Sequence, residues 1–221
     1  QEGNDTASDP AALDRSTPGH ALRCALASLR AAPAPPSPDR ALAAARICYL
    51  LADGAEEQAA REALAQEGVR WAERALATPA AAAEGRASYL LAVNLGLAVR
   101  DHPTRALASL QRLITSLDAA VRRAPEEEQG GPLRVLGMLY LMAPPWPTSV
   151  GDEDRALELL RTATERYPNH PLNHIFRAQT LWKVEGDSAR PEIRHELETA
   201  QRLLADEAPR WGDAGPRWQA Q

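Results

Sequence analysis

Aromatic and other strand-favouring residues are scarce in this chain. Phe176 is the single phenylalanine among 221 residues, and aromatic residues make up 5% of the sequence. Alanine, leucine, arginine and glutamate dominate instead, and these residues favour helices over strands. The composition therefore predicts an all-α fold and argues against one built on a sheet.

The chain also lacks an excess of positive charge. It carries 25 lysine and arginine residues against 30 acidic ones, a formal net charge of -5, and its pI is near 5.6. The arginines are spread along the sequence and interleaved with acids, whereas nucleic-acid-binding proteins gather them in a patch or stripe. We therefore expect no nucleic-acid partner.

Long apolar runs are missing as well. Crossing a bilayer takes about 18 to 20 apolar residues, and the longest run here, from Tyr89 to Val99, is interrupted by Asn94 and Gly96. The first 17 residues lack the basic start, apolar middle and small-residue cleavage site of a secretory signal. The sequence thus predicts no membrane-spanning helix.

Motifs of common enzyme classes are absent from the sequence. It contains no G-x-S-x-G, no H-E-x-x-H, no P-loop and no dinucleotide fingerprint. The acidic run Glu126-Glu127-Glu128 precedes a helix, and we interpret it as a solvated helix start that suits the positive end of the helix dipole. The chain is predicted to be no enzyme and to need no cofactor.

Helical periodicity covers most of the chain. We expect one domain over 19–206, with a poorly ordered tail at 1–18 and a second tail at 207–221. Short loops make neighbouring helices antiparallel, so about nine helices would stack as hairpins. These helices are predicted at 19–32, 39–52, 55–77, 81–100, 103–123, 131–143, 152–167, 171–184 and 190–206.

Several of these helices have recognisable start signals. Asp39 and Asp152 can each accept backbone N–H bonds at a helix start. Pro103 and Pro171 suit the first helical position, where the missing N–H of proline costs nothing.

A faint internal repeat runs through the second half of the chain. Its spacing is close to the ~34 residues of a tetratricopeptide repeat, and its alanines would let helices approach closely. We therefore predict a degenerate tetratricopeptide-like array. The matching positions are Gly151-Asp152 with Gly186-Asp187, and Ala156, Leu160 and Ala163 with Ile193, Leu197 and Ala200.

The stretch from Gly130 to Asp152 differs from the generic helix around it. An apolar helix there ends in a proline-rich loop that carries Trp146 between two prolines. A tryptophan held in this way offers a large face to a ligand or partner. It could equally fold back and fill the gap between adjacent hairpins.

Asn94 and Arg134 are polar residues on otherwise apolar helices. Buried polar groups need hydrogen-bond partners. The two residues are therefore candidates either for a structural hydrogen-bond network between helices, with Arg134 reaching a carboxylate or carbonyls, or for ligand contact.

His170 and His174 have the spacing of two metal ligands on one helix face. Pro171 counts against this use, because it makes His170 the helix cap, and no nearby cysteine or carboxylate completes a zinc site. We predict no metal site. Asn173 and His174 are expected to pack against the preceding loop, and they remain candidates for ligand or partner binding.

The two cysteines, Cys24 and Cys48, lie on apolar helical patterns on either side of a proline-rich turn. If the two helices are antiparallel, the thiols come near one another. The sequence is compatible with a disulfide and with two free buried thiols.

An ordered set of motifs over about residues 55–206 resembles the T-component family of TRAP transporters (TatT-like proteins). The combination is more specific than any one motif. The motifs are EGVRWA at 67–72, YLLAVNLG at 89–96, GGPLRVLG at 130–137, APPWP at 143–147, GD at 151–152 and PNHPLNH at 168–174.

The resemblance implies an all-helical protein of the bacterial periplasm, often tethered as a lipoprotein, that assembles as a homotrimer. Such a protein partners the substrate-binding component of the transporter and handles an apolar ligand. Gln1 stands where a lipidated cysteine would be, so a membrane link would need an anchor that this sequence does not show. The function expected is a binding and scaffold protein of the cell envelope; the alternative is a structural subunit of a larger envelope complex.

Overall fold

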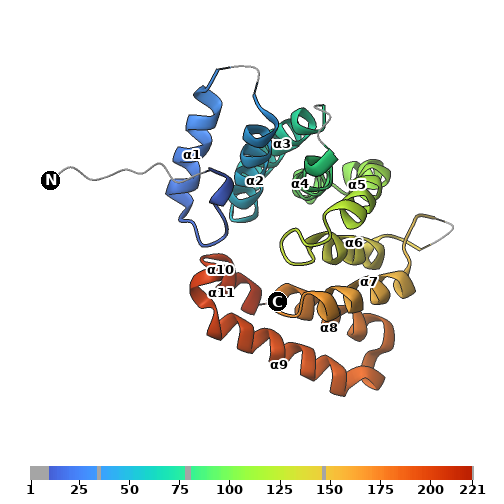
Figure 1. Cartoon of the computed structure of the whole chain (residues 1–221). Coiled ribbons are helices and arrows are strands. Elements are labelled where there is room, and N and C mark those ends of the chain that lie inside the picture. The colour runs from blue at the N-terminus through green and yellow to red at the C-terminus, as the bar shows by residue number, and fades with distance from the viewer. Residues whose placement is uncertain (1–9, 34–35, 78–80, 146–147, 221) are drawn as a thin grey trace.

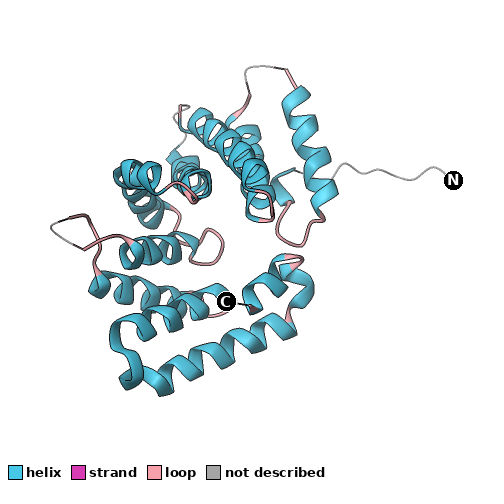
Figure 2. Cartoon of the chain, turned by 180° about the vertical axis from the view of Figure 1, so that it is seen from behind, coloured by secondary structure: helices cyan, strands magenta, loops and turns pink. Residues whose placement is uncertain are grey.

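The computed structural model describes residues 10–33, 36–77, 81–145 and 148–220. Every regular element in these ranges is helical, which confirms the predicted all-α class (Figure 2). The elements are η1 (Pro10–Ala12), α1 (Gly19–Ala31), α2 (Pro38–Asp53), α3 (Gln58–Leu76), α4 (Ala81–Val99), α5 (Pro103–Arg123), α6 (Gly131–Met142), α7 (Glu153–Arg166), α8 (Pro171–Glu185), η2 (Gly186–Ala189), α9 (Arg190–Asp206), α10 (Ala208–Trp211) and α11 (Ala214–Gln219).

The predicted helix starts hold with one change. Asp152 accepts the Arg155 backbone N–H at 2.9 Å, and Pro103 and Pro171 occupy the first turns of α5 and α8. At α2 the capping side chain is Ser37, which accepts from the Arg40 N–H. Asp39 falls inside the first turn instead, where its charge favours the helix dipole.

The helices form two layers. Consecutive helices pack against each other, and α2, α4, α6 and α8 also contact one another in sequence, α2 with α4, α4 with α6, and α6 with α8. Most residues of these four are buried, whereas α5 and α7 are one-sided, with polar outer faces. The array curves, as Figure 1 shows, so that α10 and α11 return toward α1.

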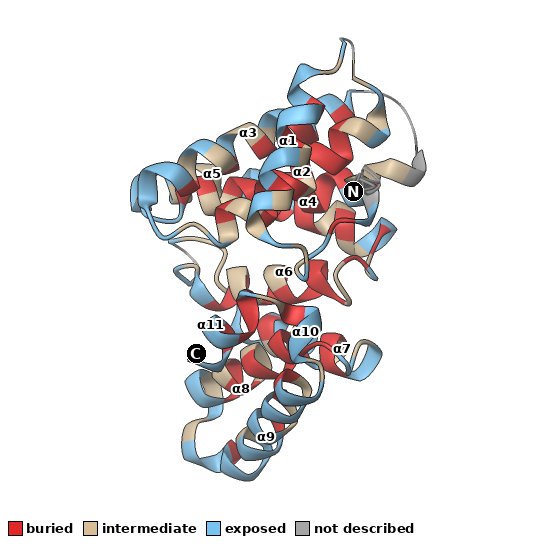
Figure 3. Ribbon diagram, turned by 90° about the vertical axis from the view of Figure 1, so that its left-hand side faces the viewer, coloured by how far each residue is buried: buried red, intermediate tan, exposed pale blue. Residues whose placement is uncertain are grey.

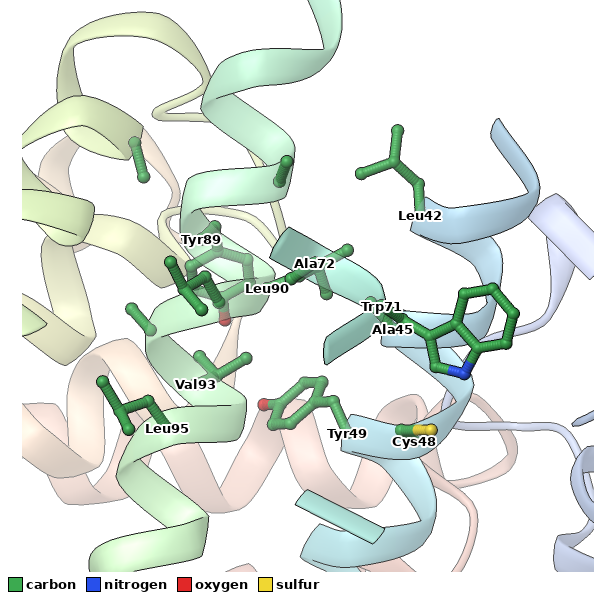
Figure 4. Packing of buried hydrophobic residues seen from close by; sticks show 14 of the residues in the cluster. Leu42, Ala45, Cys48, Tyr49, Trp71, Ala72, Tyr89, Leu90, Val93 and Leu95 are labelled. Carbon is green, nitrogen blue, oxygen red and sulfur yellow. The ribbon is translucent and has the colours of Figure 1, made fainter. Parts of the chain in front are cut away.

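Two apolar clusters make up most of the core. The larger spans α1 to α7 and includes Tyr89, Leu90 and Trp71, as Figure 4 shows. The smaller joins α8 and α9 to Trp211 and Trp218. In Figure 3 buried residues run through both the upper helices, α1 to α5, and the lower ones, α6 to α11. Polar side chains from several elements lie between these clusters.

The described residues of both segments that were predicted as tails are ordered and pack on the rest of the chain. In the N-terminal part, η1 and the following residues bury Leu13, which is 7% exposed. In the C-terminal part, α10 and α11 bury Trp211 and Trp218, which are 3% and 4% exposed. Neither segment has the long apolar periodicity that predicts a helix, yet large apolar side chains order both.

The internal repeat is not confirmed. Leu160 in α7 is fully buried, but the matching Leu197 in α9 is 41% exposed. Helix α9 lies at the edge of the array and contacts α8, η2 and the short C-terminal helices. The face of α9 that points away from α8 is therefore less covered than the corresponding face of α7. The tetratricopeptide-like character therefore stays a prediction.

No described helix is both long and apolar enough to span a membrane.

Candidate functional site

The loop between α5 and α6 has an unusual backbone. Glu128, Gln129 and Gly130 follow one another with φ angles of 47°, 50° and 85°. The left-handed region costs a non-glycine residue about 1–2 kcal/mol, so two such residues in succession need compensation elsewhere. The compensation comes from the contacts of the loop, since Glu127 and Glu128 both lie against other elements.

The prediction of a solvated acidic run holds for Glu126, which is exposed, and is wrong for Glu127 and Glu128.

Glu128 lies at the centre of a partly buried polar cluster. Its carboxylate accepts hydrogen bonds from Tyr89 Oη at 2.6 Å and from Tyr49 Oη at 3.1 Å. Two guanidinium groups lie near it, Arg15 Nη2 at 3.4 Å and Arg134 Nη2 at 3.9 Å. We call Glu128, Tyr49, Tyr89, Arg15 and Arg134 the Glu128 cluster.

The electrostatics of the cluster favour an ionised carboxylate. Burial by itself raises the pKa of Glu128, but the charges of Arg15 and Arg134 and the hydrogen bond from Tyr89 outweigh it, so the pKa is lowered. Burial also raises the pKa of Tyr49 and Tyr89 above the usual range, which keeps both phenols protonated as donors. The carboxylate of Glu128 is thus paired within an ion-pair network and is not a free base at neutral pH.

Arg134 and Asn173, two predicted site residues, are brought together beside this cluster. Arg134 Nη1 donates to Asn173 Oδ1 at 2.6 Å. Asn173 Nδ2 in turn donates to the carbonyls of Gln129 at 3.0 Å and Tyr167 at 2.8 Å. The network ties α6 and α8 to the strained loop, which is the structural alternative that the sequence left open.

Glu127 makes a second set of ion pairs. Its carboxylate contacts Arg46 of α2 and accepts from Arg86 Nε of α4 at 2.9 Å. The side chain of Glu127 is 8% exposed. Glu127 therefore links the loop to the N-terminal half of the array.

Asn94 is placed elsewhere, between α2, α3 and α4. Its Nδ2 donates to Ala45 O at 3.1 Å and to Leu90 O at 2.8 Å. A Cβ at Gly68 would lie 2.0 Å from Asn94 Oδ1, so only glycine allows α3 to approach this closely. The contacts of Asn94 are structural, and it lies apart from Arg134 and Asn173.

The two histidines do not share a metal-binding face. His170 caps α8 by accepting the Leu172 N–H at 3.3 Å. His174 Nε2 donates to Pro168 O at 2.8 Å, and its Nδ1 lies 2.5 Å from Glu196 Oε2. Over the described ranges no three His, Cys, Asp or Glu side chains are grouped so as to hold a metal ion.

His170 packs on two tryptophans that the sequence reasoning assigned to a tail. Its ring centroid lies 5.1 Å from that of Trp211, edge to face, and 5.6 Å from that of Trp218. Burial lowers the pKa of His170 well below its usual range, and the positive charges of Arg134 and Arg15 act in the same direction. The imidazole is neutral in the folded protein at neutral pH.

This burial predicts an acid-sensitive stability. Below the ordinary histidine pKa of about 6.5 the unfolded chain binds a proton that folded His170 does not, so stability is lost as the pH falls, by up to about 1.4 kcal/mol per pH unit. Urea unfolding between pH 7.5 and 5 measures this loss. His170→Asn, which keeps a capping side chain, should show a shallower slope; equal slopes in the two proteins would contradict the assignment.

Of the two alternatives that the sequence left open for the cysteines, the structure has free thiols. Cys24 on α1 and Cys48 on α2 are free thiols, the first exposed and the second buried. Although α1 and α2 do pack together, Cys48 lies in the larger apolar cluster. Burial raises the pKa of Cys48 to about 12, so its thiol is unreactive at neutral pH.

Trp146, the first candidate for ligand contact, lies outside the described residues. The loop that carries it is closed at its base, where the Gly151 N–H donates to Pro144 O at 2.8 Å. A Cβ at Gly151 would lie 2.2 Å from Ala143 O, so this closure requires glycine.

A groove of about 650 Å³ opens where residues 15–23, α2 and α3 face α11. Sequence reasoning missed it because the groove uses both segments that were predicted as tails. Its apolar wall comes from α1, α2 and α3, and its remaining side from the N-terminal segment and α11. The residues used below are Leu22, Leu50, Leu64, Ala60, Arg15 and Arg217. Trp211 and Trp218, two large apolar residues in the segment predicted as a tail, were the sequence signal that this segment is packed.

No protein-family model matches the chain, and no curated protein matches it at a significant level.

Proposed function

We propose that this chain is a non-enzymatic binding and scaffold protein of the bacterial cell envelope, similar in role to the T component that partners the substrate-binding protein of TRAP-type uptake systems. The observation that carries the proposal is the groove between α1, α2, α3 and α11. Its volume lies in the range of small-molecule sites, and leucines form one wall while a few polar groups lie opposite. An apolar ligand or an apolar segment of a partner fits this lining.

The Glu128 cluster supports a role without catalysis. A general base or nucleophile needs an unsatisfied group that can reach a substrate. Glu128 is instead surrounded by two tyrosines and two arginines, and its lowered pKa makes it a poor base. The cluster holds the array in shape.

The partners proposed are therefore an apolar small molecule and a periplasmic substrate-binding protein, with a homotrimer as the assembled form. These follow from the resemblance in the motifs from residue 67 to 174, together with the groove. The alternative function is a structural subunit of a larger envelope complex. Met142 and Trp182, which are 71% and 59% exposed, favour that alternative as apolar contact points.

The groove is tested by filling it. Ala60 is exposed on α3 and lines the groove, so Ala60→Arg places a long charged side chain against the leucine wall without disturbing the core. We expect the affinity for the neutral, apolar fluorescent dye N-phenyl-1-naphthylamine to fall by about tenfold or more. Titration by fluorescence measures this change.

Ala59→Arg is the matched control, because Ala59 is equally exposed but lines a different depression of α3. It should bind the dye as the wild type does. Equal dye affinity in all three proteins would reject the groove as a binding site. Crosslinking to a TRAP substrate-binding protein, compared in the same two variants, separates the partner role from the ligand role.

A further inference from the structure

The C-terminal segment, residues 207–219, packs as a unit distinct from the larger core. Its tryptophans belong to the smaller apolar cluster with α8 and α9. Within that cluster Trp211 and Trp218 lie 5.6 Å apart and both contact the ring of His170. Trp211 Nε1 also donates to Leu203 O of α9 at 3.2 Å.

The same segment reaches across to the beginning of the chain through a small set of contacts. Arg217 donates to the Asp53 carbonyl at 2.5 Å and lies 3.3 Å from its carboxylate. The guanidinium of Arg15 stacks over the Trp218 ring at 5.2 Å. Gly212, at a φ of 51°, passes so close to Arg15 that a Cβ would lie 2.4 Å from the Arg15 carbonyl.

These contacts differ in kind from those that hold the array together. The side chains of Arg217 and Asp53 are 43% and 24% exposed, so water competes for their hydrogen bonds. No apolar residue of the segment belongs to the larger cluster over the part of the chain that the structure describes. Opening of residues 207–219 breaks these contacts and the packing of Trp211 and Trp218 on α8 and α9, but it leaves the larger cluster intact.

Separation of this segment from the N-terminal half changes the groove, because the segment forms part of its lining. Asp213, Ala214 and Arg217 of the segment form one side of the groove, opposite Leu22 and Leu50. When the segment is away, that side is missing and the leucine wall faces solvent as an open surface. The groove exists as a binding site only in the closed arrangement.

We propose that the C-terminal segment is a gate for the groove: it opens and closes against Arg15 and Asp53 without unfolding of the larger apolar cluster, and an occupant of the groove selects the closed form. This inference rests on the proposed function for its biological role, but the gate itself is a property of the ligand-free chain. A ligand that contacts both sides binds the closed state better and so shifts the population toward it.

Amide hydrogen exchange of the ligand-free protein tests the gate. In the wild type, residues 208–219 should exchange faster than α4, because they open locally. Arg217→Ala should speed exchange in 208–219 by about fivefold, the factor that one partly exposed charged hydrogen bond corresponds to, and should leave α4 unchanged. Trp218→Ala should speed it by about tenfold or more.

Two control variants are matched to these. Arg23→Ala removes another arginine that lines the groove, from α1, and Trp182→Ala removes an exposed tryptophan of α8. Both should leave exchange in 208–219 at the wild-type rate. Wild-type exchange rates in Arg217→Ala and Trp218→Ala would overturn the gate, and so would an equal acceleration of α4 and 208–219, which would make the segment part of one cooperative core.

Failure of the gate is distinguishable from failure of the proposed function. The exchange experiment contains no ligand, whereas the groove is tested by Ala60→Arg and the dye. A groove that binds the dye beside a segment that never opens overturns the gate alone.

Discussion

Replacing Glu128 with alanine is expected to lower the free energy of unfolding by about 3–5 kcal/mol, the cost of removing one partner from a buried ion pair. The side chains of Arg15 and Arg134 are 10% and 3% exposed, and both would lose their central anion. The hydroxyl of Tyr89 would lose its acceptor as well. Urea unfolding at pH 7 measures the loss.

The neighbouring residue supplies the control. Glu126 belongs to the same acidic run but is exposed, so Glu126→Ala should change stability by less than about 0.5 kcal/mol. Because the pKa of folded Glu128 is lowered, its contribution is present above the unfolded pKa of about 4.3 and is lost as the pH falls through the folded value. The wild-type advantage over Glu128→Ala should therefore shrink below about pH 4. Similar losses in the two alanine variants would show that Glu128 is not the centre of the network.

Replacing Gly130 with alanine is expected to destabilise the protein by about 2–4 kcal/mol, from left-handed backbone strain together with overpacking. Gly130 has a φ of 85°, and an added Cβ would lie 2.7 Å from Cδ2 of Tyr167. The backbone cannot rotate to relieve the strain or the contact with Tyr167, because such a rotation would move the loop that positions Glu128 and the carbonyl of Gln129.

Gly96→Ala is the matched control. Gly96 lies inside α4, and a Cβ there would meet nothing within 4 Å. Alanine favours a helix interior by about 1 kcal/mol over glycine, so this variant should be as stable as the wild type or more so. Thermal unfolding of the two variants side by side measures the contrast. A Gly130→Ala protein as stable as Gly96→Ala would mean that the loop can adopt another backbone path.

The helices themselves were predictable from local pattern. Asp152, Pro103 and Pro171 mark helix starts in the sequence because capping and the missing proline N–H act over one turn of chain. The apolar character of Tyr89–Val99 likewise predicts an enclosed helix, and Tyr89 and Leu90 are buried in it. Period and capping depend on residues a few positions apart, so one sequence is enough to reveal them.

The candidate site was only partly predictable. Asn94 and Arg134 stood out as polar residues on apolar helices, and Asn173 and His174 were expected to pack against the preceding loop. All four are buried and hydrogen-bonded. Their partners could not be named. Arg134 and Asn173 are 39 residues apart in the chain, and which carbonyls Asn173 reaches depends on how α8 packs against the loop.

The sequence by itself determined that this chain is a run of helices with few strand formers, where most of those helices begin, and which faces are apolar, because these properties depend on neighbouring residues. The tertiary structure alone decided that Glu128 lies among arginines and tyrosines, and that Trp218 and Arg217 meet Arg15 and Asp53. Arg217 and Asp53 lie 164 positions apart. Contacts over that separation depend on the accumulated curvature of the array, which no local pattern encodes. In the same way, an acidic run or a short terminal segment has the composition of a solvated one, and only packing by distant residues buries it.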